Sequence, residues 1–150
     1  MIMMIWRRCV CLLALCLYTA LLQAAGTVTV TTAPVAGNIV RYSVAWTSTA
    51  GGVVSGNGFA VVAGSLISIR FVPGATTPTD LYDVTLVDSD GTVTSADLLS
   101  GVGANQSATT SGVFYFDPPK FTDGTRTLDV VVANAGASKT GSVVILVRRP

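Results

Sequence analysis

The sequence contains no histidine and no glutamate, so all eight of its acidic residues are aspartates. Histidine is the usual general base near neutral pH and the commonest metal ligand, and neither role can be filled by it here. A Ser–His–Asp triad or a Cys–His pair cannot be assembled from these residues. We therefore predict a protein that is not an enzyme, with no catalytic, cofactor-binding or metal-binding residues and no cofactor.

Cysteine and methionine are missing from most of the chain. The three cysteines are Cys9, Cys11 and Cys16, and no methionine follows Met4. Beyond residue 25 there is thus no thiol to react and no disulfide framework. A zinc site built from cysteines is excluded for the same reason.

Charged residues are scarce as well. They make up 11% of the chain, whereas 50% of the residues are hydrophobic. From Gly26 onward the sequence has seven basic residues and eight aspartates. Such a balance gives no basic field to attract nucleic acid, and it opposes association with like copies only weakly.

The first 25 residues have the layout of a secretory signal peptide. Arg7 and Arg8 are followed by an apolar run over Cys9–Ala20, and small residues at Ala24 and Ala25 provide a cleavage context. An uncleaved membrane anchor is an alternative, but the run is short of the roughly 20 residues that a spanning helix needs. A translation start assigned too far upstream is another. We predict a leader at 1–25 and one domain at 26–150.

Hydrophobic residues alternate with a period of two through the rest of the sequence, and Gly, Pro, Asn and Asp separate the runs. The segment Ser95–Ser100 is the only candidate for a helical turn. We therefore predict an all-β fold: a single antiparallel β-sandwich, Ig-like or jelly-roll-like, of about seven to nine strands. One face of the alternation predicts a core that consists of Tyr42, Trp46, Ile67, Ile69, Phe71, Tyr82, Val84, Leu86, Val130, Val132 and Ile145.

The stretch Asp88–Gly91 resembles the start of a calcium-binding loop. An EF-hand loop needs a bidentate glutamate at its twelfth position, and counting from Asp88 that position is Leu99. We predict instead that Asp90 and Gly91 form the tight turn of a hairpin. Calcium bound near Asp88 and Asp90 through backbone carbonyls stays open.

Asp80 and Asp83 form the other carboxylate pair that invites a chemical interpretation. Glycosidases use two carboxylates at a set separation. Asp83, however, lies on the polar face of its strand, where solvent would surround it. Asp80 follows Pro78 and suits an Asx-type turn. We predict structural roles for both.

The aromatic side chains concentrate at Phe114, Tyr115 and Phe116. Three consecutive residues of a strand cannot face the same side, so one or two must point outward if this segment is a strand. An exposed aromatic beside prolines suits a contact surface or stacking on carbohydrate. The alternative is a loop folded over the end of the core.

The order of several segments resembles a family of small proteins of tailed phages and prophages, whose genes lie among those for head and tail structure. The resemblance covers Thr27–Arg148, and its segments are VRYSVAWTS, VPGATTPTDLYDVTLVDSDG, ADLLSGVGANQS and LDVVVANAGASKTGSVVILVR. It implies a virion-associated, non-catalytic β-protein. The implied partners are like copies or other virion proteins, so that a homo-oligomer is open.

The leader and the resemblance predict different locations. The resemblance implies a virion, and phage head proteins assemble without secretion. A true signal peptide would instead give a periplasmic or secreted protein. The alternative function is accordingly an exported periplasmic or surface β-sandwich that binds glycan or protein. Neither hypothesis requires nucleic acid, or a membrane for the mature domain.

Overall fold

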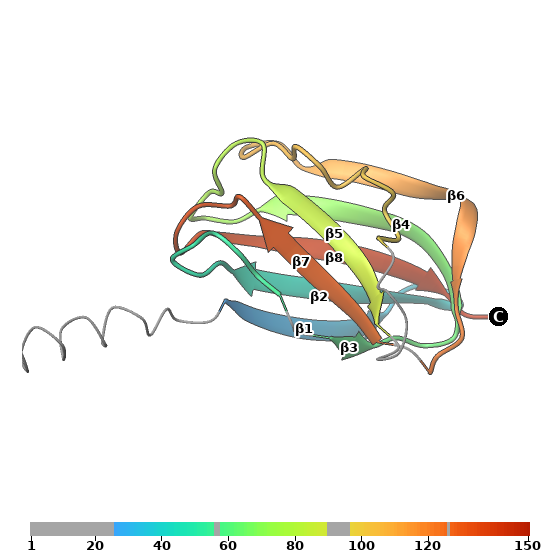
Figure 1. Cartoon of the computed structure of the whole chain (residues 1–150). Helices are drawn as coiled ribbons and strands as arrows, with labels where there is room; N and C mark the ends of the chain where they lie inside the picture. Colours follow the sequence, from blue (N-terminus) through green and yellow to red (C-terminus); the bar gives the residue numbers. More distant parts are fainter. Residues whose placement is uncertain (1–25, 56–57, 90–96, 126) are drawn as a thin grey trace, which may run out of the picture.

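The computed structural model describes residues 26–55, 58–89, 97–125 and 127–150, and all regular structure in these ranges is β (Figure 1). No helix within them is long and apolar enough to cross a membrane. The strands are β1 (Thr27–Pro34), β2 (Ile39–Thr47), β3 (Phe59–Ala60), β4 (Gly64–Pro73), β5 (Asp83–Ser89), β6 (Gly112–Thr122), β7 (Thr127–Ala133) and β8 (Thr140–Arg148).

The strands form two antiparallel sheets that pack face to face. The larger sheet has the order β1-β2-β8-β4-β6 and the smaller one the order β3-β7-β5. In Figure 1, β5 and β7 lie in front of β2, β8 and β4. The predicted antiparallel β-sandwich is confirmed.

From β2 onward the chain changes sheet at every connection between successive strands. The strands β2, β4, β6 and β8 lie in the larger sheet, and β3, β5 and β7, which come between them in the sequence, lie in the smaller one. Between β5 and β6 the segment 97–106 remains beside β5 through isolated bridges of Asp97 with Val87 and of Gln106 with Tyr82. This alternation is the connectivity of a jelly roll, one of the two sandwich types expected from the sequence.

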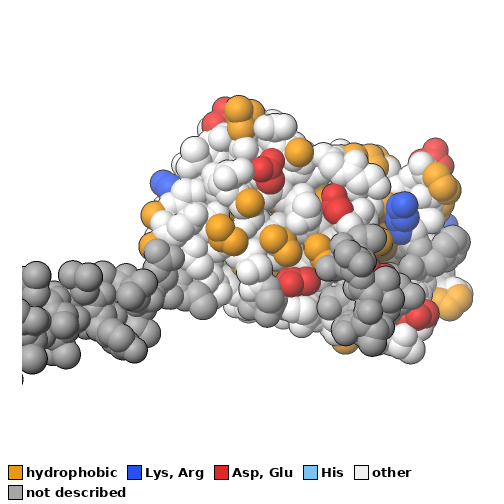
Figure 2. All heavy atoms as spheres, in the orientation of Figure 1, with side chains coloured by type: hydrophobic (Ala, Val, Ile, Leu, Met, Phe, Trp, Pro, Cys, Tyr) orange, Lys and Arg blue, Asp and Glu red, His pale blue; other side chains and the backbone are white. Residues whose placement is uncertain are grey.

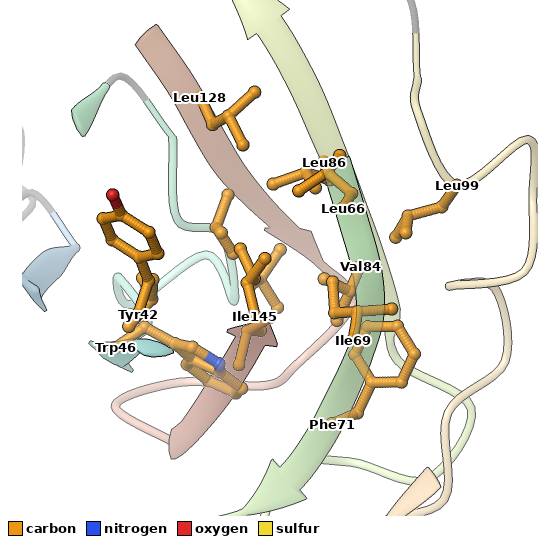
Figure 3. Packing of buried hydrophobic residues seen from close by; sticks show 14 of the residues in the cluster. Tyr42, Trp46, Leu66, Ile69, Phe71, Val84, Leu86, Leu99, Leu128 and Ile145 are labelled. Atoms are coloured by element: carbon orange, nitrogen blue, oxygen red, sulfur yellow. The ribbon is translucent and has the colours of Figure 1, made fainter. Parts of the chain in front are cut away.

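Inward-facing side chains of both sheets fill the space between them (Figure 3). In β2 every second residue is buried, which places Tyr42 and Trp46 in the core. The ring of Trp46 meets that of Tyr82 at a centroid distance of 5.9 Å, and the Tyr42 hydroxyl accepts a hydrogen bond from the Val62 amide at 2.9 Å. The predicted core is confirmed for every residue except Ile67.

Ile67 is half-buried, and its neighbour Leu66 occupies the core instead. The pairing of β4 with both β6 and β8 shifts between Leu66 and Ser68. Such a β-bulge inserts one residue without a partner, so the alternation before it is out of phase with the alternation after it. The simple period of two therefore assigned Ile67 to the wrong position.

β1 is an edge strand, because it pairs only with β2 among the described strands. Its threonines are exposed, while Val28 and Val30 pack against the core. β8 is the middle strand of the larger sheet, and its segment 143–147 is apolar on both faces.

The predicted Asp90–Gly91 hairpin turn lies outside the described residues. The described part of Ser95–Ser100 belongs to a run of turns rather than a helix: the Ser100 amide donates to the Asp97 carbonyl at 3.2 Å, and the Val102 amide to the Leu99 carbonyl at 3.1 Å.

Candidate functional site

Asp83, one of the predicted pair, anchors two loops. Its carboxylate accepts a hydrogen bond from the backbone amide of Asn105 at 2.9 Å and another from the side-chain amide of Asn134 at 2.8 Å. Both asparagines have positive φ angles, 54° and 60°, which asparagine tolerates better than most residues. The predicted structural role fits these contacts, although Asp83 is half-buried rather than simply solvated.

Asp80 also ties distant segments together. Its carboxylate accepts a hydrogen bond from the amide of Ala108 at 3.0 Å, 28 residues further along the chain. The sequence predicted a local Asx-type turn, and the structure shows a long-range contact. A local pattern could not reveal this, since the partner is brought close only by the fold.

Asp97 is a structural carboxylate that the sequence did not single out. It accepts backbone hydrogen bonds from Leu99 at 2.9 Å, Gly101 at 3.0 Å and Leu86 at 3.3 Å. The first two close its own turns, and the third attaches these turns to β5. The available signal was the residue type, because an aspartate side chain often accepts a hydrogen bond from the backbone amide two residues further along the chain.

Backbone hydrogen bonds join the connections after β2, β4 and β7 at one end of the sandwich (Figure 1). The Ser48 amide donates to the Lys139 carbonyl, and the Thr79 amide to the Ala135 carbonyl. The Ser48 hydroxyl adds a bond to the Gly136 carbonyl at 2.6 Å. These hydrogen bonds hold the three connections against one another.

The described residues contain no group of three or more acidic or thiol side chains that could hold a metal ion. Asp88 lies in β5, and Leu99, the position where an EF-hand would have its glutamate, is a fully buried core residue. Asp90 lies outside the described residues, so the calcium alternative at this loop stays a hypothesis.

Phe114, Tyr115 and Phe116 form part of the edge strand β6, and they alternate as a strand requires. Phe116 is buried, Phe114 is half-buried and packs edge-on against it at 5.4 Å, and Tyr115 is 69% exposed. Val113 also points outward and is 52% exposed. The prediction that an aromatic of this run faces solvent is confirmed.

A groove of about 210 Å³ lies between β6 and the turns that precede it. Apolar side chains dominate its lining, and its polar groups are at exposed positions. The lining residues are Leu98, Leu99, Ser100, Val102, Phe114, Phe116, Asp117, Pro118 and Lys120. The groove can hold an apolar ring or the flat face of a sugar, with a hydroxyl, a carboxylate and an ammonium group to orient it.

Two glycines within the segments quoted for the resemblance, Gly103 and Gly141, have close contacts. A Cβ at Gly103 would overlap the Val84 carbonyl, and one at Gly141 would overlap the indole ring of Trp46. Neither position therefore has room for a larger side chain.

No family model matches the chain, and neither a curated protein nor a solved structure is significantly similar to it.

Proposed function

We propose that the protein is a non-enzymatic structural or accessory component of a phage virion, prophage-encoded and associated with the head or tail. The observation that carries the proposal is the edge strand β1. Its first six residues, Thr27–Thr32, contain no charge and no proline, and no described strand pairs with their outer edge.

The two edges of the larger sheet differ in a way that supports a partner for β1. Natural proteins protect edge strands with lysine, proline or bulges, because an open edge can pair with another chain. The opposite edge, β6, has Pro118, Pro119 and Lys120. β1 has none of these before its last residue, Pro34, so a strand of a neighbouring subunit can add to it through backbone hydrogen bonds.

Two further arguments agree with this proposal. The resemblance over Thr27–Arg148 is to proteins encoded beside virion genes. Jelly rolls occur in viral capsid proteins, although they also occur in lectins, so the fold supports the role only by analogy.

The test is to induce the prophage, purify particles and search them for this chain by mass spectrometry. We expect the chain in the particles, and less of it after Thr29→Lys, since a lysine on the edge strand opposes strand addition. Thr110→Lys, in an exposed loop, is the matched control and should leave incorporation unchanged. Absence from particles, with a processed form in the periplasm, would contradict the proposal.

The groove beside β6 favours a second candidate, an exported periplasmic or surface module that binds glycan or protein. Phe114 and Pro118 offer apolar surface on which a sugar ring can stack. A glycan array followed by titration of the hits tests this candidate. Binding should be lost with Phe114→Ala and kept with Tyr115→Ala, which lies on the other face of β6; binding to no glycan or peptide would count against it.

A further inference from the structure

The outer face of the larger sheet carries three arginines from three different strands. Arg41, Arg70 and Arg148 belong to β2, β4 and β8, respectively. All three side chains are exposed, and their neighbours along each strand are buried and face the core. The remaining charged residues of this sheet are Asp117 and Lys120, which line the groove of β6.

Hydrophobic side chains lie among these arginines. Val113 and Tyr115 of β6 are exposed, and Val144 and Leu146 of β8 are half-buried. The register places Leu146 beside Arg41 and Val144 beside Arg70. We call the surface formed by Arg41, Arg70, Arg148, Val113, Tyr115, Val144 and Leu146 the arginine face.

The smaller sheet has the opposite charge on its outer face. Asp83 of β5 and Asp129 of β7 lie at outward-facing positions, and β3, β5 and β7 contain no lysine or arginine. Figure 2, which views this side of the molecule, shows acidic side chains among hydrophobic ones over β5 and β7. We call the surface formed by Asp83, Thr85, Val87, Asp129 and Val131 the aspartate face.

The charges on the two faces have the same spacing. Asp83 is four residues from Val87, and Val87 faces Asp129 on the next strand. Arg148 is likewise four residues from Val144, and Val144 faces Arg70 on the next strand. Asp83 and Asp129 are therefore separated by four residues along one strand and one step across the sheet, and so are Arg148 and Arg70. The separation is about 14 Å in both cases.

We propose that the arginine face of one copy of this chain docks on the aspartate face of the next copy, with Arg70 opposite Asp129 and Arg148 opposite Asp83. Arg148 and Asp83 lie at strand ends, whereas Arg70 and Asp129 lie within strands. When the charges are paired in this way, the smaller sheet of one copy therefore lies over the larger sheet of the other. Two arginine faces would instead place like charges together. The contact is therefore head-to-tail and builds rows of copies rather than a closed dimer.

This inference rests on the proposed role in an assembly and names the partner surface. The smaller sheet offers roughly 300 Å² of outer face, from strands about 4.8 Å apart, which is well below the ~800 Å² per partner of a stable complex. A pair in solution should therefore be weak, and its charge contacts should weaken further as salt rises.

Sedimentation velocity of the purified full chain over a wide concentration range tests the contact. We expect concentration-dependent association that decreases with salt. Arg70→Glu and Asp129→Arg should each weaken it about tenfold or more, because each opposes like charges across the contact. The double variant Arg70→Glu/Asp129→Arg should recover it, since the exchanged charges again face each other between copies.

Lys120→Glu makes the same change of net charge as Arg70→Glu, but outside both faces, and should leave association unchanged. Far-UV circular dichroism of each variant separates misfolding from lost contact. The proposal is overturned if the folded protein is monomeric at every concentration, or if the double variant associates no better than the single ones. Either result would refute the contact between the two faces but not the virion role, provided that the chain is still found in particles. Conversely, absence of the chain from particles would refute the virion role but not a contact measured by sedimentation.

Discussion

At the scale of single residues, close contacts decide which side chains the core tolerates. Gly141 of β8 lies opposite Trp46 in the register, and a Cβ there would overlap the indole ring. The ring of Tyr82 also packs against the indole, at a centroid distance of 5.9 Å, which leaves the indole less room to shift.

Gly141→Ala should therefore lower the free energy of unfolding by about 1–3 kcal/mol, the usual cost of overpacking a core. Urea denaturation measures it. Ser142→Ala, one position along at a half-buried outward position, is the matched control and should change stability little. Equal midpoints for the two variants would show that the indole has room to move.

Burial of Tyr82 has a consequence for the pH dependence of stability. It raises the pKa of the hydroxyl above its ordinary value of 10.0, because the phenolate is poorly solvated in the core. As the pH rises past that value, the unfolded chain ionises before the folded one. The contribution of this hydroxyl to the free energy of unfolding is thus fully present below the unfolded pKa. It is lost as the pH rises from the unfolded pKa through the higher folded pKa.

We expect the free energy of unfolding to fall above pH 10.0, and this fall to be smaller in Tyr82→Phe. Tyr115→Phe, at a residue that is 69% exposed, is the control and should keep the wild-type slope. Urea titrations across the alkaline range test this. Indistinguishable slopes in the two variants would refute the assignment.

At the scale of elements, the bulge in β4 decides which of two adjacent large aliphatic residues is in the core. Leu66 is fully buried and Ile67 is not. Leu66→Ala should cost about 2–5 kcal/mol, and Ile67→Ala clearly less, since only the first leaves a cavity between the sheets. Denaturation midpoints of the two variants give the comparison. The reverse order would mean that β4 keeps a regular register.

The turns around Asp97 form a second element whose geometry depends on one side chain. Asp97→Ala removes the acceptor for the amides of Leu86, Leu99 and Gly101. We expect a loss of about 2–3 kcal/mol, since hydrogen bonds to a charged acceptor are among the stronger ones. Asp97→Asn keeps one oxygen and should recover part of this. Unchanged stability and unchanged protease resistance of residues 97–105 would contradict the role.

At the scale of the whole molecule, both sheets share one core, so the sandwich should unfold as a single unit. Trp46 reports on that core by fluorescence once Trp6→Phe removes the other tryptophan. The fluorescence and far-UV transitions should coincide, and Trp46→Ala should cost about 3–5 kcal/mol. Separate transitions would show that the two sheets unfold independently.

The sequence could predict much of the sandwich and little of the candidate site. Alternation in β2, β5 and β7 identified buried residues correctly, because each of these strands has one face on the core. The groove and the ties made by Asp80 and Asp97 were not foreseen, since they join segments that are distant in the sequence or irregular in structure.

What the sequence by itself determined is the all-β class, most of the core and the outward position of an aromatic in β6. These follow from the period of two and from turn residues, which act over a few neighbours. Only the tertiary structure decided the jelly-roll order, the bulge at Ile67 and the two charged faces. Arg41, Arg70 and Arg148 are far apart along the chain, and they share one surface solely because β8 pairs with both β2 and β4.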